Sequence, residues 1–264
     1  MKKIFSVVFL CLSLLNSDFL AAQNRWSINH DGSISWNVKD RIPHYDHIEM
    51  SGLKVSTVLR YGVNADGSFE LNKSMIWPML RTIPNNTHAS LMRRFAWNAT
   101  DMVSVNGQSL SGEKVNKITL DGKMTVESTI GLPRNAEAEL TRIIFPAVAK
   151  PAVYEKYILR NTGSSPLTVE VPESRAVINT DPEKGVDGSY KLVSEIIGAA
   201  TKQLQPKEEL VFYAAITGYK NGEAELKPDV EKELQGCLKI QIPQPSIQFS
   251  VRKPIQATDL AHLS

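Results

Sequence analysis

Cysteine is almost absent from this 264-residue chain, which has Cys11 and Cys237 alone. Cys11 lies in an amino-terminal apolar stretch that we expect to be removed, so the mature chain would keep only Cys237. The fold must then depend on its hydrophobic core instead of an internal disulfide, even in an oxidising compartment. No activating partner surrounds Cys237 in the sequence, so we interpret it as a small apolar filler and not as a nucleophile.

A strong excess of charge of one sign is also missing. The chain has 30 Lys and Arg residues against 28 Asp and Glu residues, and both signs are scattered along its length. Binding to nucleic acid or to an anionic membrane requires a concentrated basic surface. We therefore predict neither nucleic acid nor a membrane as a partner.

No apolar run is long enough to span a bilayer, which takes roughly 20 residues. The main run extends from Ile4 to Leu15, follows Lys2 and Lys3, and precedes the small residues Ala21 and Ala22. A basic start, a short apolar segment and small residues at its end are typical of a signal peptide. We predict that residues 1–22 are cleaved after Ala22 and that the protein is periplasmic or secreted. Cys11 lacks the preceding small residue of a lipoprotein signal, so no lipid anchor is expected.

Catalytic motifs are missing too. The sequence has no Gly-x-Ser-x-Gly elbow, no phosphate-binding glycine loop and no His-Glu-x-x-His pair. We predict no cofactor and assign no catalytic residue. Two of the many acidic residues can meet in a cleft as the acid and base of a glycosidase, but sequence spacing does not show this.

What the sequence does have is a recurring turn signal between stretches of alternating apolar and polar residues. Asp-Gly or Asn-Gly occurs at 31–32, 66–67, 106–107 and 121–122. Such pairs favour the type I′ turn of a β-hairpin, in which both central residues have positive φ. With the longer connections of the second half, the pattern predicts roughly ten to fourteen strands.

The predicted fold is all-β: a two-sheet antiparallel β-sandwich of the supersandwich kind with one short helix. The helix is expected from Pro228 to about Leu238, because Val230, Leu234 and Leu238 recur every four residues. We expect one sandwich domain over residues 23–252, followed by a linker over residues 253–264 that leads toward a missing catalytic domain.

The densest group of chemically able side chains is His44, Asp46, His47 and Glu49. Imidazole and carboxylate groups can bind a divalent metal, but alternation along a strand would place 44 and 46 on one face and 47 and 49 on the other. We therefore predict no metal site. A hydrogen-bonded polar loop at the rim of the sandwich is the favoured interpretation. The alternative is a loop that contacts ligand, which makes these four residues candidates for carbohydrate contact.

A second group consists of Trp77, Arg81 and Asn85. An exposed tryptophan can stack on the C–H face of a sugar while arginine and asparagine bind its hydroxyls, so these residues are candidates for carbohydrate contact. The competing interpretation is that Trp77 belongs to the core and that Arg81 is structural.

Two parts of the chain carry a family resemblance. The segment 41–52 with 77–81, and the segment 143–156 with 161–163, resemble the amino-terminal sandwich region of six-hairpin glycosidases. These glycan-degrading glycoside hydrolases, common in Bacteroidetes, have their catalytic centre in a later (α/α)6 barrel. The resemblance extends to residues 251–256, where such enzymes pass from sandwich to barrel. It implies a module that packs against an (α/α)6 catalytic domain and lends a loop to its sugar-binding cleft.

The expected function is therefore that of a non-catalytic β-sandwich module of a secreted or periplasmic glycoside hydrolase, truncated before its catalytic barrel. Its partners would be a glycan or the (α/α)6 domain. Two alternatives stay open: a free-standing carbohydrate-binding protein, and a small β-sandwich polysaccharide lyase or hydrolase with its own acid and base.

Overall fold

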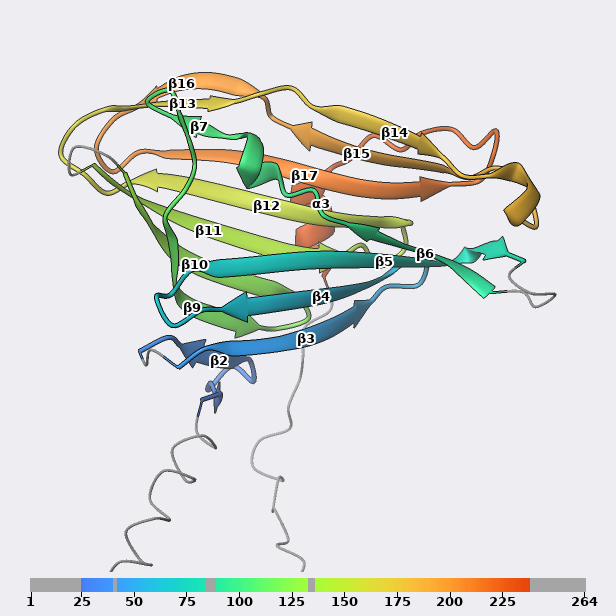
Figure 1. The fold of residues 1–264 in the computed structure, drawn as a ribbon, viewed down its shortest axis with the longest axis horizontal. Helices are drawn as coiled ribbons and strands as arrows, with labels where there is room; N and C mark the ends of the chain where they lie inside the picture. Colours follow the sequence, from blue (N-terminus) through green and yellow to red (C-terminus); the bar gives the residue numbers. More distant parts are fainter. Residues whose placement is uncertain (1–24, 40–41, 84–88, 133–135, 238–264) are drawn as a thin grey trace, which may run out of the picture.

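A computed structural model describes residues 25–39, 42–83, 89–132 and 136–237. Over these residues the protein is an all-β sandwich with antiparallel strand pairs and one short α-helix, which confirms the predicted fold class (Figure 1). The described part has seventeen strands, more than expected, because several are only two residues long. The predicted signal peptide (1–22) and linker (253–264) lie outside the described residues. No helix in the described part is long and apolar enough to cross a membrane.

One layer of the sandwich is a sheet of nine strands, which we call the large sheet. Its strands run in the spatial order β1-β2-β9-β10-β11-β12-β17-β15-β14. Their bounds are Ser27–Ile28 (β1), Ile34–Asn37 (β2), Glu113–Leu120 (β9), Met124–Gly131 (β10), Glu137–Pro146 (β11), Ala152–Asn161 (β12), Glu209–Tyr219 (β17), Lys191–Ile197 (β15) and Arg175–Asn179 (β14).

The other layer is not the single sheet that we expected but two sheets of four strands each. The β3–β6 sheet contains His44–Ser51 (β3), Ser56–Val63 (β4), Phe69–Thr82 (β5) and Ala89–Phe95 (β6), in that order. The β13 sheet, in the order β16-β13-β7-β8, contains Ala200–Leu204 (β16), Leu167–Val171 (β13), Ser104–Val105 (β7) and Gln108–Ser109 (β8). The layer divides because the chain leaves β6, passes through a 3₁₀ turn at Ala99–Met102 (η2), and enters a strand that pairs with β13.

Both small sheets cover the same face of the large sheet, and the core divides accordingly. On β12, Val153 belongs to the hydrophobic cluster shared with the β3–β6 sheet. Tyr157 and Leu159, which share its face of the strand, belong to the cluster shared with the β13 sheet. The alternation of apolar residues along these strands therefore builds one continuous inner face.

The helix α3 (Val230–Gln235) packs on the opposite face of the large sheet. Val230 and Leu234 lie against Tyr154 and its neighbours, and Asp229 caps the helix by accepting a hydrogen bond from the Lys232 amide at 3.2 Å. The helix lies inside the predicted range, and Leu238 falls outside the described residues.

Two of the predicted turns share one local structure. The segments 29–33 and 64–68 both read Asn-x-Asp-Gly-Ser, and in each the aspartate accepts hydrogen bonds from the serine amide at 3.0 Å and the serine hydroxyl at 2.7 Å. In these turns only the glycine has positive φ. A type I′ turn was expected at all four Asp-Gly and Asn-Gly pairs. Of these four pairs, only Asn106 (52°) and Gly107 (75°) both have positive φ. An aspartate can instead stabilise its turn by side-chain hydrogen bonds to the backbone.

Candidate functional site

The group from His44 to Glu49 lies on β3, the outer strand of the β3–β6 sheet, and is a strand instead of a rim loop. His44 faces inward and packs edge-on against Trp36, with ring centroids 5.2 Å apart. The Asp46 carboxylate lies 3.9 Å from His44 and accepts a hydrogen bond from the His47 amide at 2.7 Å. His47 and Glu49 are exposed. Among the described residues no group of three or more His, Cys, Asp or Glu is placed to hold a metal.

Burial next to β3 changes the acidity of one neighbour. Tyr61 lies behind the strand with its hydroxyl 3.5 Å from His44 Nε2. Burial of its ring raises the pKa of Tyr61, and the negative charge of Asp46 raises it further. The Tyr61 hydroxyl therefore stays protonated at physiological pH, and these contacts favour a structural role for the inward side chains.

Trp77 is part of the core, so its candidate role in stacking on a sugar is wrong. Its side chain is fully buried, its Nε1 donates to the Pro151 carbonyl at 2.9 Å, and its ring packs edge-on against Phe95. A Cβ added at Gly218 would lie 2.8 Å from the ring, which shows how closely β17 approaches it. The competing interpretation of Trp77 as a core residue holds.

Arg81 is exposed, and its backbone carbonyl ties two segments together. The carbonyl accepts the Tyr190 hydroxyl at 2.6 Å and the Val186 amide at 2.9 Å. Asn85, the third residue of this group, lies outside the described residues. The backbone of Arg81 therefore has a structural role, and carbohydrate contact by its side chain stays a prediction.

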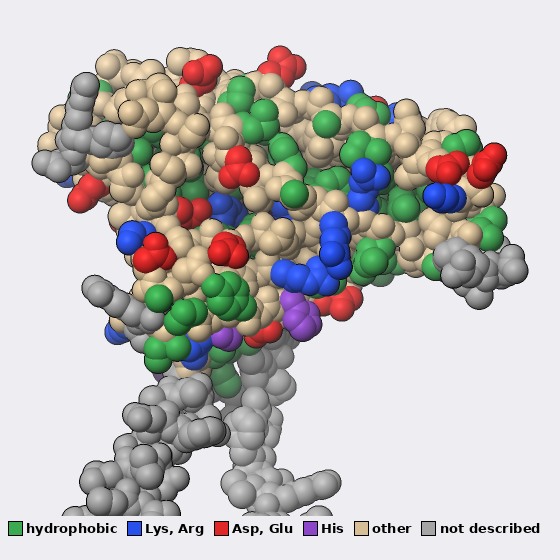
Figure 2. Space-filling model, viewed as in Figure 1, with side chains coloured by type: hydrophobic (Ala, Val, Ile, Leu, Met, Phe, Trp, Pro, Cys, Tyr) green, Lys and Arg blue, Asp and Glu red, His purple; other side chains and the backbone are tan. Residues whose placement is uncertain are grey.

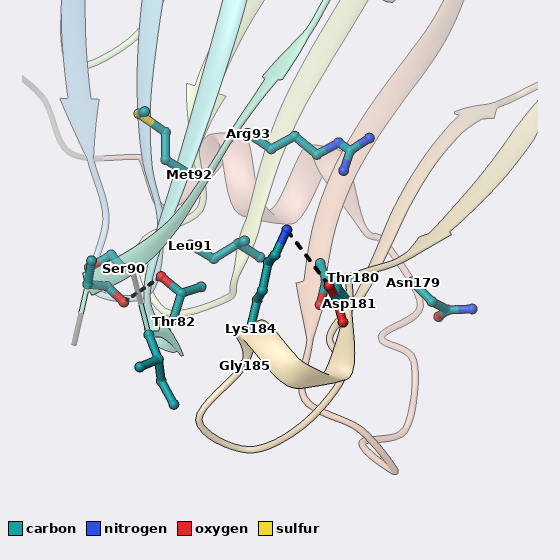
Figure 3. A pocket seen from close by; sticks show the side chains of 12 residues that line it. Thr82, Ser90, Leu91, Met92, Arg93, Asn179, Thr180, Asp181, Lys184 and Gly185 are labelled. Carbon is teal, nitrogen blue, oxygen red and sulfur yellow. Dashed lines mark hydrogen bonds and ion pairs between the residues drawn. The ribbon is translucent and has the colours of Figure 1, made fainter. Parts of the chain in front are cut away.

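A groove of about 480 Å³ opens beside Arg81, between the end of the β5–β6 pair and the segment that follows β14 (Figure 3). Two backbone contacts place its walls: the Ile83 amide donates to the Lys184 carbonyl at 3.1 Å, and Thr82 forms an isolated bridge with Gly185. Only glycine fits at 185, because a Cβ there would lie 1.8 Å from the Gly188 carbonyl oxygen. The walls are thus fixed by main chain and do not depend on long side chains.

The groove combines apolar and polar groups. Leu91 is half-buried at its β6 wall, and Arg93 points from the same strand toward Asn179 and Thr180 on the opposite wall, whereas Met92 points away (Figure 3). Strand alternation explains this, since Leu91 and Arg93 share one face of β6. This mixture suits a ligand that has both C–H surface and hydroxyl groups.

One carboxylate lines the groove, and it already has partners. Asp181 begins a 3₁₀ turn at Pro182–Lys184 (η4), where its Oδ1 accepts the Glu183 amide at 3.0 Å. Its Oδ2 lies 3.8 Å from the Lys184 ammonium. These contacts hold the wall of the groove in place.

A group of ionised and polar side chains that was not predicted from the sequence is buried between the layers. Lys73 and Glu155 are almost completely buried and their Nζ and Oε1 atoms are 2.5 Å apart, while the Tyr157 hydroxyl donates to the other oxygen of Glu155. Burial raises the pKa of Tyr157, and the adjacent Glu155 charge raises it further. Strand alternation could have indicated this group. Lys73 is on the same face of β5 as the buried Met75 and Trp77. Glu155 is likewise on the same face of β12 as the buried Val153 and Tyr157.

A second buried ion pair continues this group. Arg142 lies 3.3 Å from Glu113 and places its guanidinium over the rings of Phe69 and Tyr157. The Lys73–Glu155 pair links β5 to β12 across the layers, whereas Arg142 and Glu113 both lie on the large sheet and Arg142 reaches the other layer through its contact with Phe69. We interpret both pairs as structural and not as a reactive centre.

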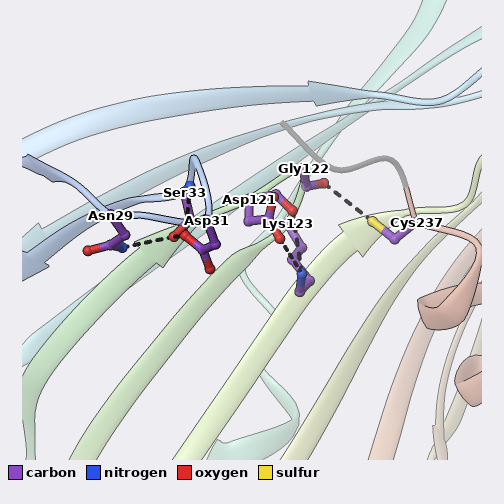
Figure 4. A network of polar contacts seen from close by, with 7 residues as sticks. All are labelled: Asn29, Asp31, Ser33, Asp121, Gly122, Lys123 and Cys237. Atoms are coloured by element: carbon purple, nitrogen blue, oxygen red, sulfur yellow. Dashed lines mark hydrogen bonds and ion pairs between the residues drawn. The ribbon is translucent and has the colours of Figure 1, made fainter. Parts of the chain in front are cut away.

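Cys237 lies at the end of the described chain, against the turn between β9 and β10 (Figure 4). Its Sγ contacts the Gly122 carbonyl at 3.5 Å. Burial raises the pKa of the Cys237 thiol, which keeps it protonated and poorly nucleophilic. This supports its interpretation as a filler. Figure 4 also shows the Asn29–Ser33 turn near this place.

The sequence matches no model of a known protein family and no curated protein. Among solved structures, a putative kojibiose phosphorylase from the human microbiome is similar, with a TM-score of 0.30 and 10% sequence identity. The match covers 77% of this chain and 29% of that protein, so the chain spans less than a third of its length. A likeness at this level determines neither a fold nor a function.

Proposed function

We propose that this chain is a non-catalytic β-sandwich module of a secreted or periplasmic glycan-degrading protein and that it contacts glycan in the groove between β6 and η4. The observation that carries the proposal is the groove itself. It is large enough for one or two sugar rings, its backbone is fixed, and it offers Leu91 beside the polar side chains of Arg93, Asn179 and Thr180.

The groove favours binding over catalysis. A glycosidase needs two carboxyl groups on either side of the scissile bond, one of them protonated. Asp181 is engaged by the η4 backbone and lies near Lys184. No second carboxylate is among the described residues that line the groove, so the described lining does not supply the pair of carboxyl groups that a glycosidase needs.

We expect weak binding, because the groove is open and has no aromatic ring among its described lining residues. A Kd of about 1–10 mM corresponds to roughly 3–4 kcal/mol of binding free energy. Amide chemical shifts of residues 23–264 titrated with neutral oligosaccharides can detect this. The shifts should be confined to β6, the end of β14 and η4.

Arg93→Ala should weaken binding at least about ten-fold, because a hydrogen bond from a charged group contributes about 1.5–3 kcal/mol and about 1.4 kcal/mol corresponds to a factor of ten in Kd. Arg160→Ala is the matched control, since Arg160 is also exposed but lies on β12 near Glu209. Absence of any shift with a broad oligosaccharide panel, or equal weakening in both variants, would contradict glycan contact at the groove. Turnover of an aryl glycoside that is lost in Asp181→Asn would instead favour the hydrolase alternative.

A further inference from the structure

The outer face of the β3–β6 sheet carries a second set of polar side chains, on the opposite side of β6 from the groove. Arg60 on β4 is paired in register with Asn72 on β5, and Ser74 on β5 with Arg94 on β6. Alternation points the intervening residues Leu59, Lys73 and Phe95 inward, so these four side chains share the solvent face. Figure 2 shows Lys and Arg side chains gathered over this sheet, next to histidine.

These side chains surround a pocket of about 380 Å³. Ser74 lies at its floor with only 3% of its surface exposed, and both arginines are exposed at its walls. Arg60 Nη1 donates to Ser74 Oγ at 3.1 Å, which fixes one guanidinium above the floor. Since Ser74 Oγ accepts that bond, its own hydrogen is available to a ligand.

The arginines of the described residues differ in their ion pairs. Arg142, Arg160 and Arg175 each have a carboxylate within 4 Å. In the part of the chain that the structure describes, no such ion pair involves Arg60 or Arg94. Two nearby carboxylates lie on the same outer face. Glu70 on β5 accepts a hydrogen bond from Asn64 at 3.0 Å, and Glu49 is on β3, which is two strands away from β5.

We propose that the pocket formed by Arg60, Asn72, Ser74 and Arg94 binds an oxyanion, the carboxylate or sulfate group of an acidic saccharide. Two guanidinium groups of like charge repel each other until an anion lies between them. Guanidinium also matches the planar geometry of a carboxylate and the paired oxygens of a sulfate. The Asn72 amide and the Ser74 hydroxyl add neutral donors, and the exposed Ala96 leaves the mouth open to a larger ligand.

The saccharide part of this inference rests on the proposed function, whereas the oxyanion part does not. The test therefore uses three probes at one fixed ionic strength: sodium sulfate against sodium chloride, a uronic-acid disaccharide, and a neutral disaccharide of equal size. Binding is followed by amide chemical shifts of residues 23–264. We expect sulfate and the uronic acid to shift residues around 60 on β4 and 74 on β5, and the neutral disaccharide to leave these two strands unchanged while it shifts the groove residues of β6, β14 and η4.

Arg60→Gln and Arg94→Gln should each weaken uronic-acid binding at least about five-fold, and the double variant should abolish it. Arg160→Gln is the matched control and should bind like the wild type. Higher salt should weaken binding, because exposed charges are screened within about 10 Å at 0.1 M. Sulfate binding without uronic-acid binding would refute the acidic saccharide and leave the oxyanion site. Equal binding by the double variant and the wild type would refute the site.

Discussion

Replacing Lys73 with methionine tests whether the buried ion pair links the two layers. Lys73 on β5 and Glu155 on β12 are 0% and 1% exposed, and their charged atoms are 2.5 Å apart. At an effective dielectric constant of 20, the attraction at this distance is about 7 kcal/mol, most of which offsets the cost of removing both charges from water. The net contribution of the pair is therefore small, but the loss of one partner is not.

Lys73→Met leaves the Glu155 carboxylate buried with the hydrogen bond from the Tyr157 hydroxyl but without its ion-pair partner. An unpaired buried charge costs about 3–5 kcal/mol. With a urea m-value of roughly 3 kcal/mol/M, the unfolding midpoint should fall by about 1 M or more. Urea unfolding followed by tryptophan fluorescence measures this shift.

The double variant Lys73→Met/Glu155→Gln is the decisive comparison. Glutamine removes the charge but keeps an acceptor for the Tyr157 hydroxyl, so the double variant should lose only about 1 kcal/mol relative to wild type. Glu155→Gln alone should be costly, because it leaves the lysine charge unpaired. A single variant that loses less than about 1 kcal/mol, or a double variant as unstable as Lys73→Met, would refute this reasoning.

Three further predictions concern local contacts. Gly218→Ala should destabilise the protein by about 1–3 kcal/mol in urea unfolding, because the new Cβ would lie 2.8 Å from the enclosed Trp77 ring; an unchanged midpoint would contradict the packing. Asp66→Ala should lower the urea unfolding midpoint through the lost Ser68 hydrogen bonds, while Asp66→Asn, which keeps an acceptor, should lower it less; equal midpoints for the two variants would contradict a role for these bonds. Hydrogen bonds from Lys156 and Tyr213 lower the pKa of Glu231, so its contribution to holding α3 is complete above the unfolded value of about 4.3 and is lost as the pH falls through the lower folded pKa. The protection of the α3 amides against exchange, corrected for the intrinsic pH dependence of exchange, should therefore fall below about pH 4, and Glu231→Gln should remove that fall.

Local chemistry explains why the turns and the strands could be predicted from sequence. Each Asx-Gly pair is a turn because glycine supplies the positive φ, and apolar alternation assigns the inward face of most strands. The repeated Asn-x-Asp-Gly-Ser sequence carries its own hydrogen bonds, so no distant residue is needed to form it. The α3 helix was predictable for the same reason, from the spacing of Val230 and Leu234.

Long-range pairing explains what could not be predicted. The partner of Lys73 is 82 residues away in sequence, and the division of the second layer depends on β7 pairing with β13. The burial of Trp77 was ambiguous because β5 is irregular just after it. Trp77 pairs with Leu91, but the residue before Leu91, Ser90, pairs with Arg81. Pro78 lies in this bulge, where it has no ladder hydrogen bond to donate. Alternation beyond Trp77 therefore does not continue in step with β6.

The strand β6 connects the two proposed binding surfaces. Its inward side chains Leu91 and Arg93 line the groove, while Arg94 faces the oxyanion pocket on the other side. Because β6 is the outer strand of its sheet, it is held by hydrogen bonds to β5 on one side only. A slip of one residue would exchange the two faces and place Arg94 in the groove. The fixed register between Lys73 and Phe95, beside the buried Lys73–Glu155 pair, prevents that exchange. The buried pair anchors β5 to the large sheet, and β5 in turn pairs with β6, the strand that both proposed surfaces share.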